Sequence, residues 1–117
     1  MNIPSPISIS PEDLNIWLLS DRNKPVIVDV REKDELILAS FPYDFIHIPL
    51  SEFTGSLSDL NPGLLMNKKI VVLCHSGVRS YNFGCWLLAK NLVKEIWNLE
   101  EGIDGWSKYV DPRIPRY

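Results

Sequence analysis

The sequence contains little cysteine, no long apolar run and few positive charges. Its 117 residues include two cysteines and two histidines, with no C-x-x-C or H-x-x-x-H spacing of the kind that binds zinc. No apolar run approaches the roughly 20 residues of a transmembrane helix, and the first residues lack the basic and apolar regions of a secretory leader. The formal charge is −3 and the basic residues are scattered, which argues against a nucleic-acid surface. We therefore expect a soluble protein with no metal site and no nucleic-acid or membrane partner.

The two cysteines are not expected to form a disulfide. Cys74 follows an apolar run, whereas Cys85 lies about two turns into the helix expected next, so they should be on the order of 10 Å or more apart. A disulfide needs Cα atoms closer than about 7 Å. Reduced thiols are typical of a reducing compartment, and we expect a cytoplasmic location. The length and the 45% hydrophobic composition fit one domain over residues 1–117.

Short apolar runs alternate with amphipathic segments along the chain. Such alternation predicts parallel strands joined by right-handed crossovers, and hence a small three-layer α/β domain with a central, mostly parallel sheet of four to five strands flanked by helices. The expected strands are 26–30, 45–49, 70–73 and 95–99. The expected helices are 10–19, 32–39, 78–92 and a short one at 106–109, with short helical turns between 51 and 66 and an extended tail over 111–117.

The segment Cys74-His75-Ser76-Gly77-Val78-Arg79-Ser80 lies where a buried strand ends and a helix begins. Backbone N–H groups of such a turn, together with the positive end of a helix dipole, favour an anionic sulfur. Gly77 permits backbone conformations closed to other residues. Ligands of parallel sheets bind at the carboxyl ends of the strands, where Cys74 falls. The segment therefore predicts a reactive thiol rather than a small buried hydrophobe.

Other polar residues near this edge have more than one interpretation. Asp29 ends a strand at the same sheet edge and, with Arg31, is expected to form an ion pair beneath the loop in a structural role. Arg79 either orients an anionic donor or braces the loop through its carbonyls and a neighbouring acid. His75 is expected to be an exposed, variable side chain, the alternative being a contact with the thiolate or substrate.

Three motifs together resemble the single-domain rhodanese-like sulfurtransferases. Residues 26–32 resemble the family's "IDVRE" segment, 74–80 resemble its C-x-S-G-x-R-S loop, and 102–106 resemble its closing "GGIxxW" segment. The tail 111–117 also resembles the rhodanese tails of some sulfur-carrier activating enzymes. Two departures occur: residues 40–45 replace a "GHIPGA" segment, and Glu101 stands where a first glycine is common.

The resemblance implies that Cys74 takes a sulfane sulfur from a donor such as thiosulfate and passes it, as a persulfide, to a thiol, to cyanide or to a sulfur-accepting protein. The residues of the loop that follow Cys74 are expected to bind the substrate, Asp29 and Arg31 to support them, and no cofactor is expected. These substrate-binding residues are His75, Ser76, Gly77, Val78, Arg79 and Ser80.

Two other functions fit parts of the same pattern. A sulfur-carrier or partner-binding module would use the fold without turning over thiosulfate, with 40–45 and the tail as a docking surface. A cysteine-based phosphatase has a related loop, but with five residues between cysteine and arginine. Cys74 and Arg79 enclose four, a tighter ring that suits sulfur better than phosphate, and no separate acid for the leaving group is evident.

Overall fold

Five parallel strands form the centre of the molecule, which is known from a computed structural model that describes residues 4–20, 22–56, 60, 62–93 and 95–117. In the sheet the strand order is β1-β5-β4-β2-β3, and every neighbouring pair is parallel. This confirms the expected α/β class. The strands are β1 (Ile7–Ile9), β2 (Val26–Asp29), β3 (Ile46–His47), β4 (Ile70–Leu73) and β5 (Ile96–Leu99).

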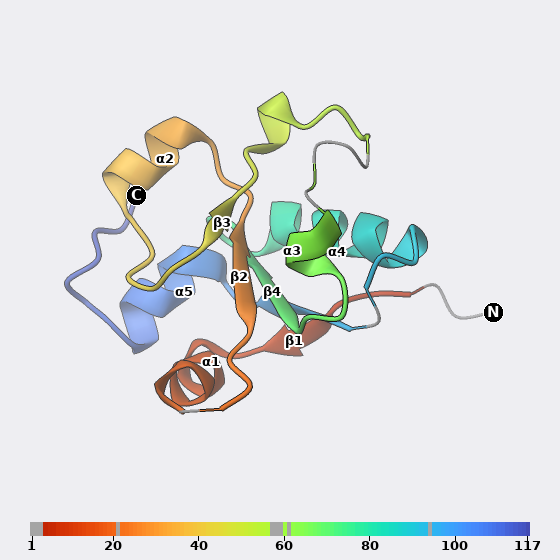
Figure 1. Cartoon of the computed structure of the whole chain (residues 1–117). Helices are drawn as coiled ribbons and strands as arrows, with labels where there is room; N and C mark the ends of the chain where they lie inside the picture. Colours follow the sequence, from red (N-terminus) through yellow and green to blue (C-terminus); the bar gives the residue numbers. More distant parts are fainter. Residues whose placement is uncertain (1–3, 21, 57–59, 61, 94) are drawn as a thin grey trace.

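Helices cover both faces of the sheet, as Figure 1 shows. Helices α1 (Pro11–Leu19) and α5 (Gly102–Tyr109) pack on one face, and α3 (Pro62–Leu65) and α4 (Val78–Ala89) pack on the other. The short helix α2 (Lys33–Leu38) and the 3₁₀ turn η1 (Leu50–Glu52) follow β2 and β3. No helix among these described residues has the length and apolar character needed to cross a membrane.

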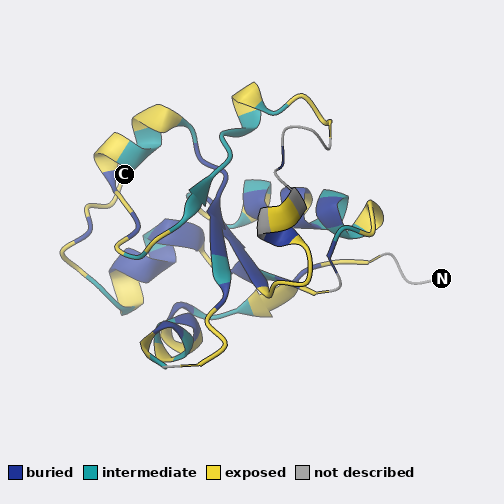
Figure 2. Ribbon diagram, viewed as in Figure 1, coloured by how far each residue is buried: buried dark blue, intermediate teal, exposed yellow. Residues whose placement is uncertain are grey.

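The central strands are buried on both faces because their side chains alternate between two apolar layers (Figure 2). On β4, Val71 and Leu73 pack toward α1 and α5, whereas Ile70 and Val72 pack toward α4. Each layer is completed by helical side chains at helical spacing. These are Leu14, Leu18, Ile103 and Trp106 on one face and Leu65, Phe83 and Leu87 on the other.

Local signals explain where several elements begin. The Ser10 hydroxyl caps α1 by accepting a hydrogen bond from the Asp13 N–H at 3.1 Å, and Pro11 opens the helix. The expected helical turns between 51 and 66 are present as η1 and α3, although 57–59 and 61 lie outside the described residues. Both cysteines are free thiols, and Cys85 is half-buried on α4.

Several elements differ from the expectation. The edge strand β1, three residues long and beside β5, was not expected, and the strand expected over 45–49 is confined to Ile46–His47. Helix α4 ends at Ala89 rather than at 92. Helix α5 begins at Gly102 rather than 106, because its first N–H groups find acceptors in the loop after β4: Ile103 donates to the Cys74 carbonyl at 2.9 Å and Asp104 to the His75 carbonyl at 3.1 Å.

Candidate active site

Cys74 lies at the carboxyl end of β4, in the middle of the sheet. Its side chain is 1% exposed, and its Sγ lies 3.1 Å from the Gly77 backbone N–H, which donates to it. Gly77 adopts a left-handed conformation, φ +104°, and caps α4. The strand-to-helix turn expected from the sequence is therefore present, and it directs a backbone donor and a helix N-terminus toward the sulfur.

A buried polar network fixes the shape of the loop. The Ser80 hydroxyl lies 3.3 Å from Cys74 Sγ and also donates to Asn98 Oδ1. Asn98, on β5, in turn donates from Nδ2 to the Gly77 carbonyl at 2.9 Å. A hydroxyl has one hydrogen, so at any moment Ser80 donates a hydrogen bond either to the Cys74 sulfur or to Asn98. Asn98 connects β5 to Gly77 and to Ser80 of the loop.

The amino end of α5 packs directly against the backbone of Cys74 and His75. Gly102 is in the left-handed region with φ +56°, and a Cβ there would lie 2.3 Å from the Cys74 carbonyl oxygen and 2.5 Å from that of His75. Only glycine allows so close an approach. This gives a physical reason for the glycine of the closing segment noted in the sequence.

Asp29 and Arg31 form a fully buried ion pair at the same sheet edge, as expected. Arg31 Nη2 lies 2.8 Å from Asp29 Oδ2, and both side chains are 0% exposed. Burial lowers the pKa of Arg31, but the hydrogen bonds with Asp29 and Tyr117 outweigh it, so the pKa is raised. His47 Nε2 lies 2.6 Å from the Arg31 carbonyl. This cluster joins β2, β3 and the residues before α2.

Arg79 projects from the first turn of α4 toward α2, where it meets Glu35. Its two terminal nitrogens donate to the two Glu35 carboxylate oxygens, each at 2.8 Å. The hydrogen bond with Arg79 lowers the pKa of Glu35 to about 2 against the opposing effect of burial, and the Glu32 backbone N–H adds to the lowering. Between the two alternatives for Arg79, this geometry favours bracing through an acid.

His75 is half-buried, so the expectation of an exposed side chain is wrong. The Tyr117 ring stacks on it with centroids 4.1 Å apart and an interplanar angle of 11°. The Tyr117 hydroxyl donates to Glu35 Oε1 and accepts from Arg31 Nη1, both at 3.1 Å. Burial raises the pKa of Tyr117 and outweighs the hydrogen bond with Arg31, which lowers it.

The remaining loop residues expected to bind substrate differ in exposure: Ser76 and Val78 are exposed, and Ser80 is buried.

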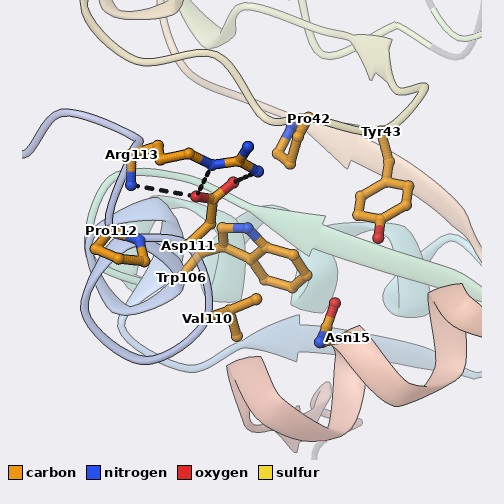
Figure 3. A pocket seen from close by; sticks show the side chains of 8 residues that line it. All are labelled: Asn15, Pro42, Tyr43, Trp106, Val110, Asp111, Pro112 and Arg113. Carbon is orange, nitrogen blue, oxygen red and sulfur yellow. Dashed lines mark hydrogen bonds and ion pairs between the residues drawn. The ribbon is translucent and has the colours of Figure 1, made fainter.

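The atypical segment 40–45 packs against α5. Phe41 is 3% exposed and its ring centroid lies 4.9 Å from that of Trp106. A hollow of about 610 Å³ lies beside it, shown in Figure 3. Asn15, Pro42, Tyr43, Trp106, Val110, Asp111, Pro112 and Arg113 line this hollow. None of these lining residues belongs to the loop 74–80, so the hollow is a separate feature from the surroundings of Cys74.

Three residues of the site were missed in the sequence: Asn98, Glu35 and Tyr117. Asn98 could have been found, because a polar side chain within the apolar run of β5 must be hydrogen-bonded when buried. Glu35 and Tyr117 gave no comparable signal, since their partners in the loop, Arg79 and His75, are 44 and 42 positions away. Among the described residues, no group of three His, Cys, Asp or Glu side chains could hold a metal ion.

Comparison with known proteins agrees with the motifs. The model of the family described as "Rhodanese-like domain" matches residues 13–109. The chain is 37% identical over 91 residues, 78% of its length, to the rhodanese-like/PpiC domain-containing protein 12, chloroplastic, of Arabidopsis thaliana. It is 35% identical over 81 residues, 69% of its length, to the putative sulfur carrier protein YrkF of Bacillus subtilis. The chain spans 30% of the plant protein's length and 40% of the Bacillus protein's length.

Comparison of the fold with solved structures points to the same family. The crystal structure of a rhodanese-like domain protein from Staphylococcus aureus superposes with a TM-score of 0.71 at 26% identity, covering 95% of this chain and 98% of that one. The buried cysteine that accepts from a backbone N–H at the strand-to-helix turn, the family match over most of the chain and this superposition agree, and the chain belongs to the rhodanese-like domain family.

Proposed function

We propose that the protein is a sulfurtransferase that moves a sulfane sulfur through a persulfide on Cys74. The donor is a compound such as thiosulfate, and the acceptor is a thiol or cyanide. The observation that supports this most is the position of Cys74 Sγ, 3.1 Å from the Gly77 N–H at the amino end of α4. Family membership supports the same activity, as does similarity to a protein of Allochromatium vinosum named "Sulfurtransferase", which is 26% identical over 96 residues.

In the first half-reaction the Cys74 thiolate attacks the outer sulfur of the donor. With thiosulfate, a bond forms between Sγ and this sulfur, the original S–S bond breaks, and its electron pair leaves with sulfite. The product is a Cys74 persulfide with a negative outer sulfur. Backbone N–H donors at the turn and the dipole of α4 stabilise this charge, so no side chain has to transfer a proton.

In the second half-reaction the acceptor attacks the outer sulfur of the persulfide. A thiolate acceptor becomes a persulfide and cyanide becomes thiocyanate, while the electron pair of the broken S–S bond returns to Cys74 as thiolate. Ser80 and Asn98 hold the loop during this exchange, since both stay hydrogen-bonded to it or to each other. Both half-reactions balance without an external oxidant or cofactor.

A sulfur-carrier module without thiosulfate turnover is the second candidate. Arg79, the cation within the loop, donates from both terminal nitrogens to Glu35, and one relative is named a putative sulfur carrier protein. Phosphatase activity has less support, because the four-residue spacing from Cys74 to Arg79 suits a sulfur atom better than a phosphate and the guanidinium binds a carboxylate. We also propose that residues 1–117 form one domain that works in the cytoplasm, where thiols stay reduced.

The experiment is a steady-state assay of thiocyanate formation with thiosulfate and cyanide. We expect turnover in the wild type and in Cys85→Ser, and none in Cys74→Ser. Formation of the Cys74 persulfide without release of thiocyanate would favour the sulfur-carrier module. Absence of both, together with hydrolysis of an aryl phosphate, would rule out sulfur transfer.

A further inference from the structure

Residues 111–117 are fixed to α5 at several points and end with the Tyr117 ring stacked on His75 of the active loop. Ser107 Oγ on α5 donates to the Ile114 carbonyl, and the Ile114 side chain is 8% exposed in the core beneath α1 and α5. Arg116 makes two hydrogen bonds to the Asp104 carboxylate, at 2.7 and 3.1 Å. In Figure 1 the end marked C lies beside α2. These contacts hold Tyr117 in one place.

Tyr117 connects three segments of the site: the active loop, α2 and the residues after β2. Its ring covers His75 of the loop, and its hydroxyl bridges Glu35 of α2 and Arg31 after β2. A stacked aromatic ring presents a broad apolar surface. The approach to the loop therefore has an aromatic wall on the side formed by His75 and Tyr117.

The cation at this approach is already neutralised. Glu35 receives two hydrogen bonds from Arg79, one from the Tyr117 hydroxyl and one from the Glu32 backbone N–H at 2.8 Å. The Glu35 and Arg79 side chains are 18% and 37% exposed, so a ligand at the surface meets the pair rather than a lone guanidinium. A doubly charged anion would have to displace the Glu35 carboxylate from a two-pronged contact.

We propose that Glu35 and Tyr117 are specificity-determining residues that disfavour doubly charged sulfur donors and favour donors with one charge and an apolar body. Glu35 acts through its charge, and Tyr117 acts by holding Glu35 in place and by offering its ring. This inference rests on the proposed sulfur transfer at Cys74. It refines the donor from any sulfane compound to one of the aromatic thiosulfonate or organic persulfide class.

A suitable probe of this class is benzenethiosulfonate, which carries one negative charge and a phenyl ring. The Cys74 thiolate would attack its outer sulfur, the S–S bond would break, and benzenesulfinate would leave with the electron pair. The product at Cys74 is the same persulfide that thiosulfate gives. The two donors therefore differ in charge and shape but not in the group transferred.

The first test compares kcat/KM for thiosulfate with kcat/KM for benzenethiosulfonate. We expect Glu35→Gln to shift the ratio toward thiosulfate about tenfold, and Tyr117→Phe to shift it in the same direction about threefold. The double variant should shift it no further than Glu35→Gln alone, because Tyr117 acts on charge through Glu35. Tyr109→Phe is the control, since Tyr109 is an exposed tyrosine of α5 outside this cluster; its ratio should not move.

The second test needs no sulfur transfer. In a Cys85→Ser background, the rates at which Cys74 reacts with iodoacetate and with iodoacetamide compare an anion with a neutral reagent of similar size. We expect the same two substitutions to shift this ratio toward iodoacetate, while thermal unfolding shows that each variant is folded.

The outcomes of these tests distinguish the specificity inference from the proposed sulfur transfer at Cys74. If both donors deliver sulfur but neither ratio changes in any Glu35 or Tyr117 variant, the specificity inference is wrong and the proposed function stands. If neither donor delivers sulfur to the wild type but the alkylation ratios shift as stated, the proposed function is wrong and selection by charge at this approach stands. If Glu35→Gln unfolds, Tyr117→Phe alone decides the inference by the same criteria.

Discussion

Replacing Gly102 by alanine should displace the active loop. The new Cβ would lie 2.3 Å from the Cys74 carbonyl oxygen, 2.5 Å from the His75 carbonyl oxygen and 2.6 Å from the His75 carbonyl carbon. All three atoms belong to backbone, so no side chain can rotate away. Either the loop or the first turn of α5 has to move.

The cost has two parts. Alanine at φ +56° adds about 1–2 kcal/mol of backbone strain. Separation of α5 from the loop weakens the hydrogen bonds of Ile103 and Asp104 to the loop carbonyls, each contributing about 0.5–1.5 kcal/mol. We expect Gly102→Ala to lower the free energy of unfolding by about 2–5 kcal/mol, measured by urea denaturation.

Gly55 provides a matched control. It also has a positive φ, +83°, but a Cβ there would have no neighbour within 4 Å. Gly55→Ala should therefore lower the free energy of unfolding only by the backbone strain of about 1–2 kcal/mol, and its sulfur-transfer activity should be unchanged. Gly102→Ala should lose most of its sulfur-transfer activity because Cys74 is displaced. Equal losses of stability in the two variants would refute the idea that Gly102 is required by close approach to the loop.

Three further predictions concern the residues around the loop. Glu101→Gly should raise the free energy of unfolding by up to about 1 kcal/mol, because Glu101 has φ +58° and glycine removes that strain; an unchanged urea midpoint would contradict this. Asp29→Ala should lower the free energy of unfolding by about 3–5 kcal/mol, since it leaves Arg31 buried without its carboxylate; a loss below 1 kcal/mol would be typical of a surface pair instead. The stabilisation from Glu35, whose pKa falls from 4.5 to about 2, should be fully present above pH 4.5 and be lost as the pH falls toward about 2; urea unfolding across this range should show a shallower acid dependence in Glu35→Gln.

Much of the fold could be predicted because the chain's local signals agree with its packing. The runs 26–28 and 70–73 are short, apolar and rich in β-branched residues, as strands buried on both faces require. Ser10 and Pro11 mark the start of α1. In contrast, β1 is only three residues long and partly exposed at the sheet edge, and it depends on pairing with β5, which no local pattern reveals.

In the candidate site, too, contacts between neighbours in sequence could be predicted and contacts between distant residues could not. The turn around Cys74 and the Asp29–Arg31 pair could be predicted because both depend on neighbours in sequence. The contacts of Glu35 and Tyr117 with the loop depend on how α2 and the tail fold back, over 44 and 42 positions respectively. His75 was expected to be exposed for this reason: nothing near it in the sequence indicates the ring that covers it.

The most direct test of sulfur transfer through Cys74 is mass spectrometry of the intact protein after incubation with a sulfane donor, followed by peptide mapping. We predict one added sulfur, located on the peptide that contains Cys74, absent from Cys74→Ser, retained in Cys85→Ser and removed by cyanide. An added sulfur found on Cys85, or a wild-type mass that no donor changes, would contradict the account.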